Sequence, residues 1–174
     1  LDDDDLFGDF DTDEELLGTL LTEDMVPNVW LVEEHSPSFR QFYSSSDKLS
    51  AIFSLSAECA VAQPIDIVNT SMEDCLDTVA WTERLIWISP PNKDEAYYAE
   101  LAYYLADEQI NRGNYFAIAM PRNSEFWNSE YMVDLATHEY VSYATINLDA
   151  FDPSLRNVKS MCIMHNLTAQ AFEP

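Results

Sequence analysis

Glycine and basic residues are both scarce in this sequence. The 174-residue chain has 3 glycines, and its 8 lysines and arginines face 32 aspartates and glutamates, for a formal net charge of −24. This surplus of negative charge repels phosphate backbones and anionic lipids, so direct nucleic-acid binding and membrane-surface binding are not expected. Three explanations stay open: a solubility or high-salt adaptation, a docking surface for a basic partner, or an acidic mimic of nucleic acid.

Cysteine and histidine are also few and scattered. The three cysteines are Cys59, Cys75 and Cys162, and the three histidines are His35, His138 and His165. No CxxC pair and no zinc-finger spacing occurs, so we predict reduced core thiols and no metal site. The sequence has no apolar stretch of spanning length and no charged-then-apolar leader, which predicts an intracellular protein, cytoplasmic or nuclear. The sequence begins with Leu1 and not with Met, which is the pattern expected of a processed or trimmed fragment.

Residues 1–25 differ in composition from residues 26–174. Acids surround a group of leucines at positions 16, 17, 20 and 21, and these four leucines fall on one face of a short helix. We therefore divide the chain into an acidic amphipathic N-terminal tail, 1–25, and an α/β domain, 26–174. Acidic-hydrophobic segments can fold onto a partner, but the same pattern also suits a solvated extension or a first helix that packs on its own domain.

From residue 26 onward, strand-like and helix-like patterns alternate. Strands are predicted at 28–33, 51–55, 65–68, 85–89, 115–120, 140–148 and 158–165, and helices at 71–81, 93–112 and 124–138. Residues 35–38 suggest a turn, followed by a short segment to residue 46. The run at 85–89 is continuously apolar and should be central. The order predicts a three-layer α/β fold with a mostly parallel sheet and an antiparallel strand near the C-terminus.

Four different short motifs follow one another along this pattern. They are Ser36-Pro37 followed by Arg40, Pro90-Pro91 after a strand, Gln109 four residues before Gly113, and Ser124 three residues before Trp127. In their order and spacing they resemble the class I (Rossmann-like) methyltransferase fold. The resemblance is nearest to the small, diverged DNA-methyltransferase-like domains of retroelement and phage polyproteins.

This resemblance implies where a site would lie. Ser89, Pro90, Pro91 and Asn92 would form the loop that meets the acceptor base, and Glu34, Ser36 and Glu58 would face the methyl donor, with Glu58 holding its ribose. The donor loop normally needs glycine so that the backbone can approach the cofactor, and none lies there. Asn92 stands where related enzymes carry a nucleophilic cysteine or a stacking aromatic residue. Tyr97 or Tyr98 could supply a ring from the next helix, although packing explains both.

These substitutions favour a catalytically inactive, methyltransferase-like domain with a vestigial acceptor loop and no bound cofactor. Such a domain would act as an interaction module for a protein partner that carries a basic surface or a hydrophobic groove. One alternative is a divergent S-adenosylmethionine-dependent amino-methyltransferase acting on nucleic acid. Another is an acidic nucleic-acid mimic that inhibits a DNA-binding protein, and its binding should depend strongly on salt.

Overall fold

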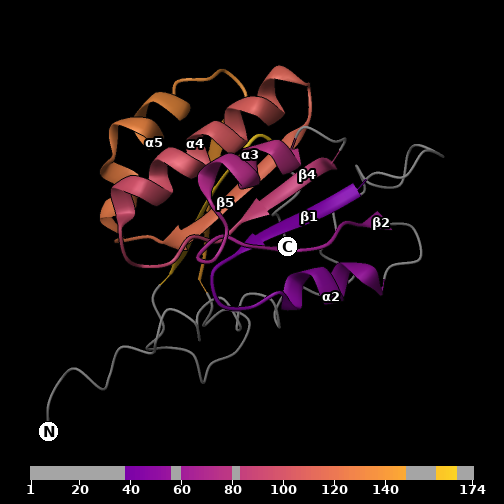
Figure 1. Cartoon of the computed structure of the whole chain (residues 1–174). Helices are drawn as coiled ribbons and strands as arrows, with labels where there is room; N and C mark the ends of the chain where they lie inside the picture. The colour runs from indigo at the N-terminus through magenta and orange to yellow at the C-terminus, as the bar shows by residue number, and fades with distance from the viewer. Residues whose placement is uncertain (1–37, 56–59, 80–82, 148–159, 168–174) are drawn as a thin grey trace, which may run out of the picture.

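The fold is a mixed sheet with helices on both faces (Figure 1). The computed structural model describes residues 38–55, 60–79, 83–147 and 160–167, and the predicted tail at 1–25 and the predicted strand at 28–33 lie outside them. The elements in chain order are β1 (Ser38–Tyr43), α2 (Lys48–Ser54), β2 (Ala60–Val61), β3 (Ile65–Asp66), α3 (Met72–Val79), β4 (Glu83–Ile88), α4 (Glu95–Asn111), β5 (Tyr115–Pro121), the 3-10 helix η4 (Glu125–Asn128), α5 (Glu130–Leu135), β6 (Ser142–Ile146) and β7 (Met161–His165).

The strand order confirms the predicted fold class. The sheet runs β2-β1-β4-β5-β7-β6, and β3 continues the edge by pairing with β1. All pairs among strands β1 to β5 are parallel, whereas β7 is antiparallel to both β5 and β6. Strand β4 is central, as its unbroken apolar run predicted, because both of its faces are covered.

Two apolar layers sandwich the sheet. Figure 1 shows α3, α4 and α5 on one face and α2 on the other. Side chains alternate along the strands, so Ile86, Ile88 and Phe116 pack beneath α3, α4 and α5. Leu85 and Trp87 instead face the α2 side. The three-layer arrangement thus follows from the period-two pattern of strands that are apolar on both faces.

Local signals define the helices on the crowded face. Ser71 caps α3 as predicted: its hydroxyl accepts a hydrogen bond from the Asp74 amide at 3.1 Å and donates to the Asp74 carboxylate at 2.8 Å. Helix α4 ends before Gly113, which adopts the left-handed conformation with φ of 69° that a helix stop requires. The helix predicted at 124–138 is instead two short pieces, η4 and α5, because Ser129 is extended and caps α5 through the Met132 amide.

Two sequence predictions are wrong in the first half of the chain. Residues 51–55 were expected to form a strand, but residues 48–54 form α2, since a short apolar run does not distinguish a strand from a buried helix. The short segment after the turn predicted at 35–38 was not assigned to a strand, yet residues Ser38–Tyr43 form β1, which pairs with β4. Its polar residues disguised it, because Arg40 and Gln41 are satisfied by hydrogen bonds inside the protein.

One expected packing stripe is also only partly correct. Along α4, Leu101 and Leu105 are fully buried and Ile110 is half-buried, as predicted. The spacing of apolar residues over 93–112 also predicts Tyr97 on this stripe and allows Tyr104 in place of Leu105, but the two tyrosines remain 40% and 39% exposed. The tyrosines therefore lie on the outer side of the helix, away from the sheet.

Candidate functional site

The topology places the candidate ligand crevice at the carboxyl ends of β1 and β4. After β1 the chain moves to β2 and β3 on one side, and it later returns to place β4 on the other side. In open parallel sheets, ligands bind where the strand order reverses in this way. The loops that meet there follow Tyr43, Asp66 and Ile88, the last residues of β1, β3 and β4.

The predicted acceptor loop lies at this point, but most of it is packed into the protein. Ser89 is only 2% exposed, and its hydroxyl oxygen accepts a hydrogen bond from the Trp87 indole nitrogen at 3.0 Å. The Ser89 amide donates to the Phe42 carbonyl of β1 at 2.9 Å. Pro90 and Pro91 are buried, whereas Asn92 is exposed. Only Asn92 of the four predicted acceptor residues is thus presented to solvent.

The predicted donor loop does not follow the first described strand. Glu34 and Ser36 lie outside the described residues, and β1 begins after them at Ser38. The loop that leaves β1 toward the crevice is therefore 44–47, with three serines and an aspartate and no glycine. The Ser46 carbonyl accepts a hydrogen bond from Gln41 at 2.8 Å, which ties this loop to the strand before it.

Asp66 is an acid at the end of β3, a strand that runs parallel to β1. Glu58 lies outside the described residues, and the segment before it is helix α2. The half-buried Asp66 closes β3, and its carboxylate accepts hydrogen bonds from the Val68 amide at 3.0 Å and from the Asn69 side chain at 2.6 Å. This arrangement is an Asx-turn, in which the acid shapes its own loop.

Sequence reasoning missed Asp66 because it assigned residues 65–68 to one strand. The strand stops at Asp66, and Ile67 and Val68 already belong to the turn. An Asp followed by Asn69, Thr70 and Ser71 is a turn signal that could have placed the strand end correctly.

Two of the four motifs that resemble methyltransferases make hydrogen bonds to the backbone. Gln109 is fully buried, and its side-chain amide donates to the Glu83 and Tyr115 carbonyls, each at 2.9 Å. Ser124 caps η4, and the Trp127 indole donates to the Pro121 carbonyl at 3.0 Å. These motifs hold strand ends and helix ends in place, so they mark the scaffold rather than a reaction.

The buried titratable groups are suited to packing rather than to catalysis. Burial, with a smaller contribution from Asp74, raises the pKa of the Cys75 thiol to about 11, so the nucleophilic thiolate is suppressed at neutral pH. Burial lowers the pKa of His165, whose Nδ1 accepts a hydrogen bond from the Leu167 amide at 3.1 Å. Within the described ranges, no group of three or more His, Cys, Asp or Glu side chains could hold a metal ion.

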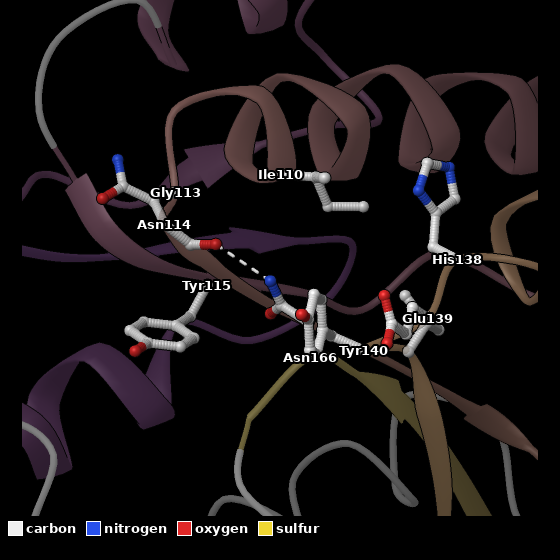
Figure 2. Close-up of a pocket in the computed structure, with 9 residues that line it drawn as sticks. Ile110, Gly113, Asn114, Tyr115, His138, Glu139, Tyr140 and Asn166 are labelled. Atoms are coloured by element: carbon white, nitrogen blue, oxygen red, sulfur yellow. Dashed lines mark hydrogen bonds between the residues drawn. The ribbon is translucent and has the colours of Figure 1, made fainter.

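A cavity of about 570 Å³ opens at the amino end of β5, opposite the strand ends that form the crevice. It lies where α4 ends and β5 begins, beside the loop before β6 (Figure 2). Figure 2 shows Asn166 among the lining residues, donating a hydrogen bond to the Asn114 carbonyl, which is 2.9 Å long. His138 and Ile110 line the same cavity. Its position at the amino end of β5 separates it from the loops where this fold type binds ligands.

Comparison with known proteins supports the fold. No protein-family model matches the chain, and no curated protein matches it. Among solved structures, the chain is similar to a release factor-specific protein-(glutamine-N5) methyltransferase from Alicyclobacillus acidocaldarius, with a TM-score of 0.51 and 11% identity over 95% of this chain and 97% of that one. The chain therefore has a Rossmann-like, methyltransferase-like fold. The resemblance to retroelement and phage domains stays a prediction. No helix in the described part of the chain has the length and apolar character needed to cross a membrane.

The Ser89→Ala variant tests whether the acceptor serine is a structural residue. Removing the hydroxyl leaves the buried Trp87 indole N–H without its acceptor, so we expect the unfolding free energy to fall by about 1–3 kcal/mol in urea titrations. Asn92→Ala, at the exposed end of the same loop, should change it by less than about 0.5 kcal/mol. Equal stability of Ser89→Ala and the wild type would contradict a structural role.

Proposed function

We propose that this chain is a methyltransferase-like domain that has lost methyl transfer and works by binding a basic protein partner. The loss of methyl transfer is inferred from the burial of Ser89, whose hydroxyl accepts a hydrogen bond from the Trp87 indole in the core. A catalytic acceptor loop must present its polar groups to a base or another substrate. Here the loop is used to lock β4 against β1 through the Phe42 carbonyl.

The donor side of the crevice also fits S-adenosylmethionine poorly. The loop 44–47 carries a Cβ at every position, where a close backbone approach favours glycine. Asp66 stands at the position of the ribose-binding acid, but both of its carboxylate oxygens already accept hydrogen bonds from its own turn. A bound ribose would have to compete with these contacts, so we assign no chemical step to the cofactor.

The proposed binding of a basic protein partner is inferred from the charge of the chain. A chain with a net charge of −24 attracts cationic partners over a long range and repels phosphate backbones. The three helices on one face of the sheet contain nine acids and no lysine or arginine: Glu73, Asp74, Asp77, Glu95, Glu100, Asp107, Glu108, Glu130 and Asp134. A one-signed helical layer of this kind suits a protein with a basic surface.

Titration with S-adenosylmethionine tests the loss of methyl transfer. We expect no heat of binding in calorimetry and no shift of the melting temperature at millimolar donor, because the loop 44–47 has no glycine and both carboxylate oxygens of Asp66 are engaged in its own turn. Asp66→Asn serves as the matched control, since it removes the charge that a ribose would need. Donor binding that disappears in Asp66→Asn would instead establish a working donor site.

One alternative has a specific observation in its favour. Asn92 is exposed beside the crevice, and Asp66 lies at the end of a neighbouring strand, which is the placement expected of a divergent amino-methyltransferase. That enzyme would bind donor and transfer the label from S-[methyl-³H]-adenosylmethionine to nucleic acid. Loss of the label incorporation in Asn92→Ala would support this alternative over the binding role.

A further inference from the structure

The outer face of α4 and α5 carries tyrosines and acids in a regular arrangement. On α4, Tyr97, Glu100, Tyr104 and Asp107 recur at intervals of three and four residues, so they follow one side of the helix. On α5, Tyr131 and Asp134 lie beside them, because the two helices pack against each other (Figure 1). We call these six residues the tyrosine-acid face.

The rings of this face are held in place by their neighbours. The centroid of Tyr104 lies 5.5 Å from that of Tyr103, in an edge-to-face contact, and 6.3 Å from that of Tyr131. The Tyr103 and Tyr131 centroids are 5.5 Å apart. Tyr103 is itself anchored, because its hydroxyl donates to the Asp134 carboxylate at 2.8 Å. Tyr104 is thus an exposed ring on a packed support, which lowers the entropy lost when a partner binds.

The phenols of Tyr103 and Tyr131 stay protonated at neutral pH. The hydrogen bond to Asp134, and then burial, raises the pKa of Tyr103 to about 12, so its phenol stays protonated and continues to donate. Partial burial and the Glu100 carboxylate raise the pKa of Tyr131. Neutral rings beside ionised carboxylates form a surface that is electron-rich and negatively charged.

The chemistry of this face selects one kind of ligand. A guanidinium group stacks on an aromatic ring and also donates hydrogen bonds to carboxylates in a fixed planar geometry, which an ammonium group does less well. Neither α4 nor α5 contains a lysine or arginine that would compete. Arg112, just beyond α4, pairs with Glu108 at 3.3 Å, at the end of the helix remote from Tyr97.

The spacing along α4 adds a geometric condition. Tyr97 and Tyr104 are both exposed and lie two helical turns apart, a separation of about 10 Å. In an extended peptide of the polyproline II type, two arginines three residues apart lie on the same side and about 9 Å apart, close to the spacing of the two rings. From these observations we infer that the tyrosine-acid face binds an extended, arginine-containing segment of a partner protein. This inference rests on the proposed function and locates its binding surface.

The test is fluorescence anisotropy with a labelled peptide that carries two arginines spaced by two neutral residues. The full chain is used, and each substitution leaves the net charge unchanged. We expect Tyr104→Ala to weaken binding about tenfold, since it removes the central ring. Tyr104→Phe, which keeps the ring, should bind as the wild type does, and so should Tyr140→Ala, whose ring is 77% exposed on the loop before β6. Circular dichroism checks that each variant is folded.

The outcomes separate the two proposals. If the wild type does not bind the arginine peptide at all, the proposed basic partner is wrong, and the inference falls with it. If the wild type binds but Tyr104→Ala binds equally well, the basic partner stands and the tyrosine-acid face is not its docking surface. Equal losses in Tyr104→Ala and Tyr140→Ala would show only general aromatic attraction and would also overturn the inference.

Discussion

Glu83→Ala should destabilise the fold more than any other single change to a polar residue. Glu83 is 2% exposed at the start of the central strand β4, and it accepts a hydrogen bond from the Arg40 Nε at 2.7 Å. Its removal leaves a guanidinium that is only 14% exposed without its carboxylate. Breaking a buried ion pair from one side costs about 3–5 kcal/mol, because the remaining charge is stranded. Urea unfolding followed by tryptophan fluorescence measures the loss directly.

The double variant Arg40→Met/Glu83→Leu is the decisive control. Both charges disappear together, and an apolar pair of similar volume can be as stable as a buried ion pair, or more so. The second oxygen of Glu83 is buried and, in the described part of the structure, has no hydrogen-bond partner, so the native pair already bears a desolvation cost. We expect the double variant to recover most of the stability. A double variant as unstable as Glu83→Ala would contradict an electrostatic origin.

The same ion pair explains why sequence patterns missed strand β1. In β1, Arg40 and Gln41 interrupt the apolar residues, so the segment resembles a loop. Inside the protein, Gln41 is 1% exposed and accepts hydrogen bonds from the Ser50 amide and hydroxyl. A pattern based on apolar residues cannot anticipate partners that lie 9 and 43 positions away. Strands β4 and β5 and helix α4 were easier to predict, because the two strands are almost continuously apolar and Gly113 marks the end of the helix.

The end of strand β4 was predictable from the sequence, but the packing of the loop after it was not. The Pro90-Pro91 loop lies after a central strand, as predicted, because prolines stop strands. Glu58 was predicted at the end of a strand over 51–55, but those residues belong to or follow helix α2, and Glu58 itself lies outside the described residues. The burial of Ser89 could not be foreseen, because its partner Trp87 is two residues away on the same strand, where side chains share a face.

The Gln109→Met variant should also be less stable than the wild type. The Gln109 amide bridges the Glu83 and Tyr115 carbonyls at the first residues of β4 and β5. Methionine fills a similar volume but donates no hydrogen bond, so two buried carbonyls lose their partner at a cost of about 2–4 kcal/mol. The measurement is the unfolding free energy in urea, with Asn111→Ala on the exposed side of the same helix as the control.

If Gln109→Met lowers the unfolding free energy and Asn111→Ala does not, Gln109 has a structural role in joining β4 and β5. A bridge of this kind depends on one side chain and two backbone groups, so the rest of the sequence can diverge around it. That is consistent with a fold likeness at 11% identity and a TM-score of 0.51. If Gln109→Met were as stable as the wild type, the motif would need another explanation, and the cavity beside Gly113 would be the first place to seek it.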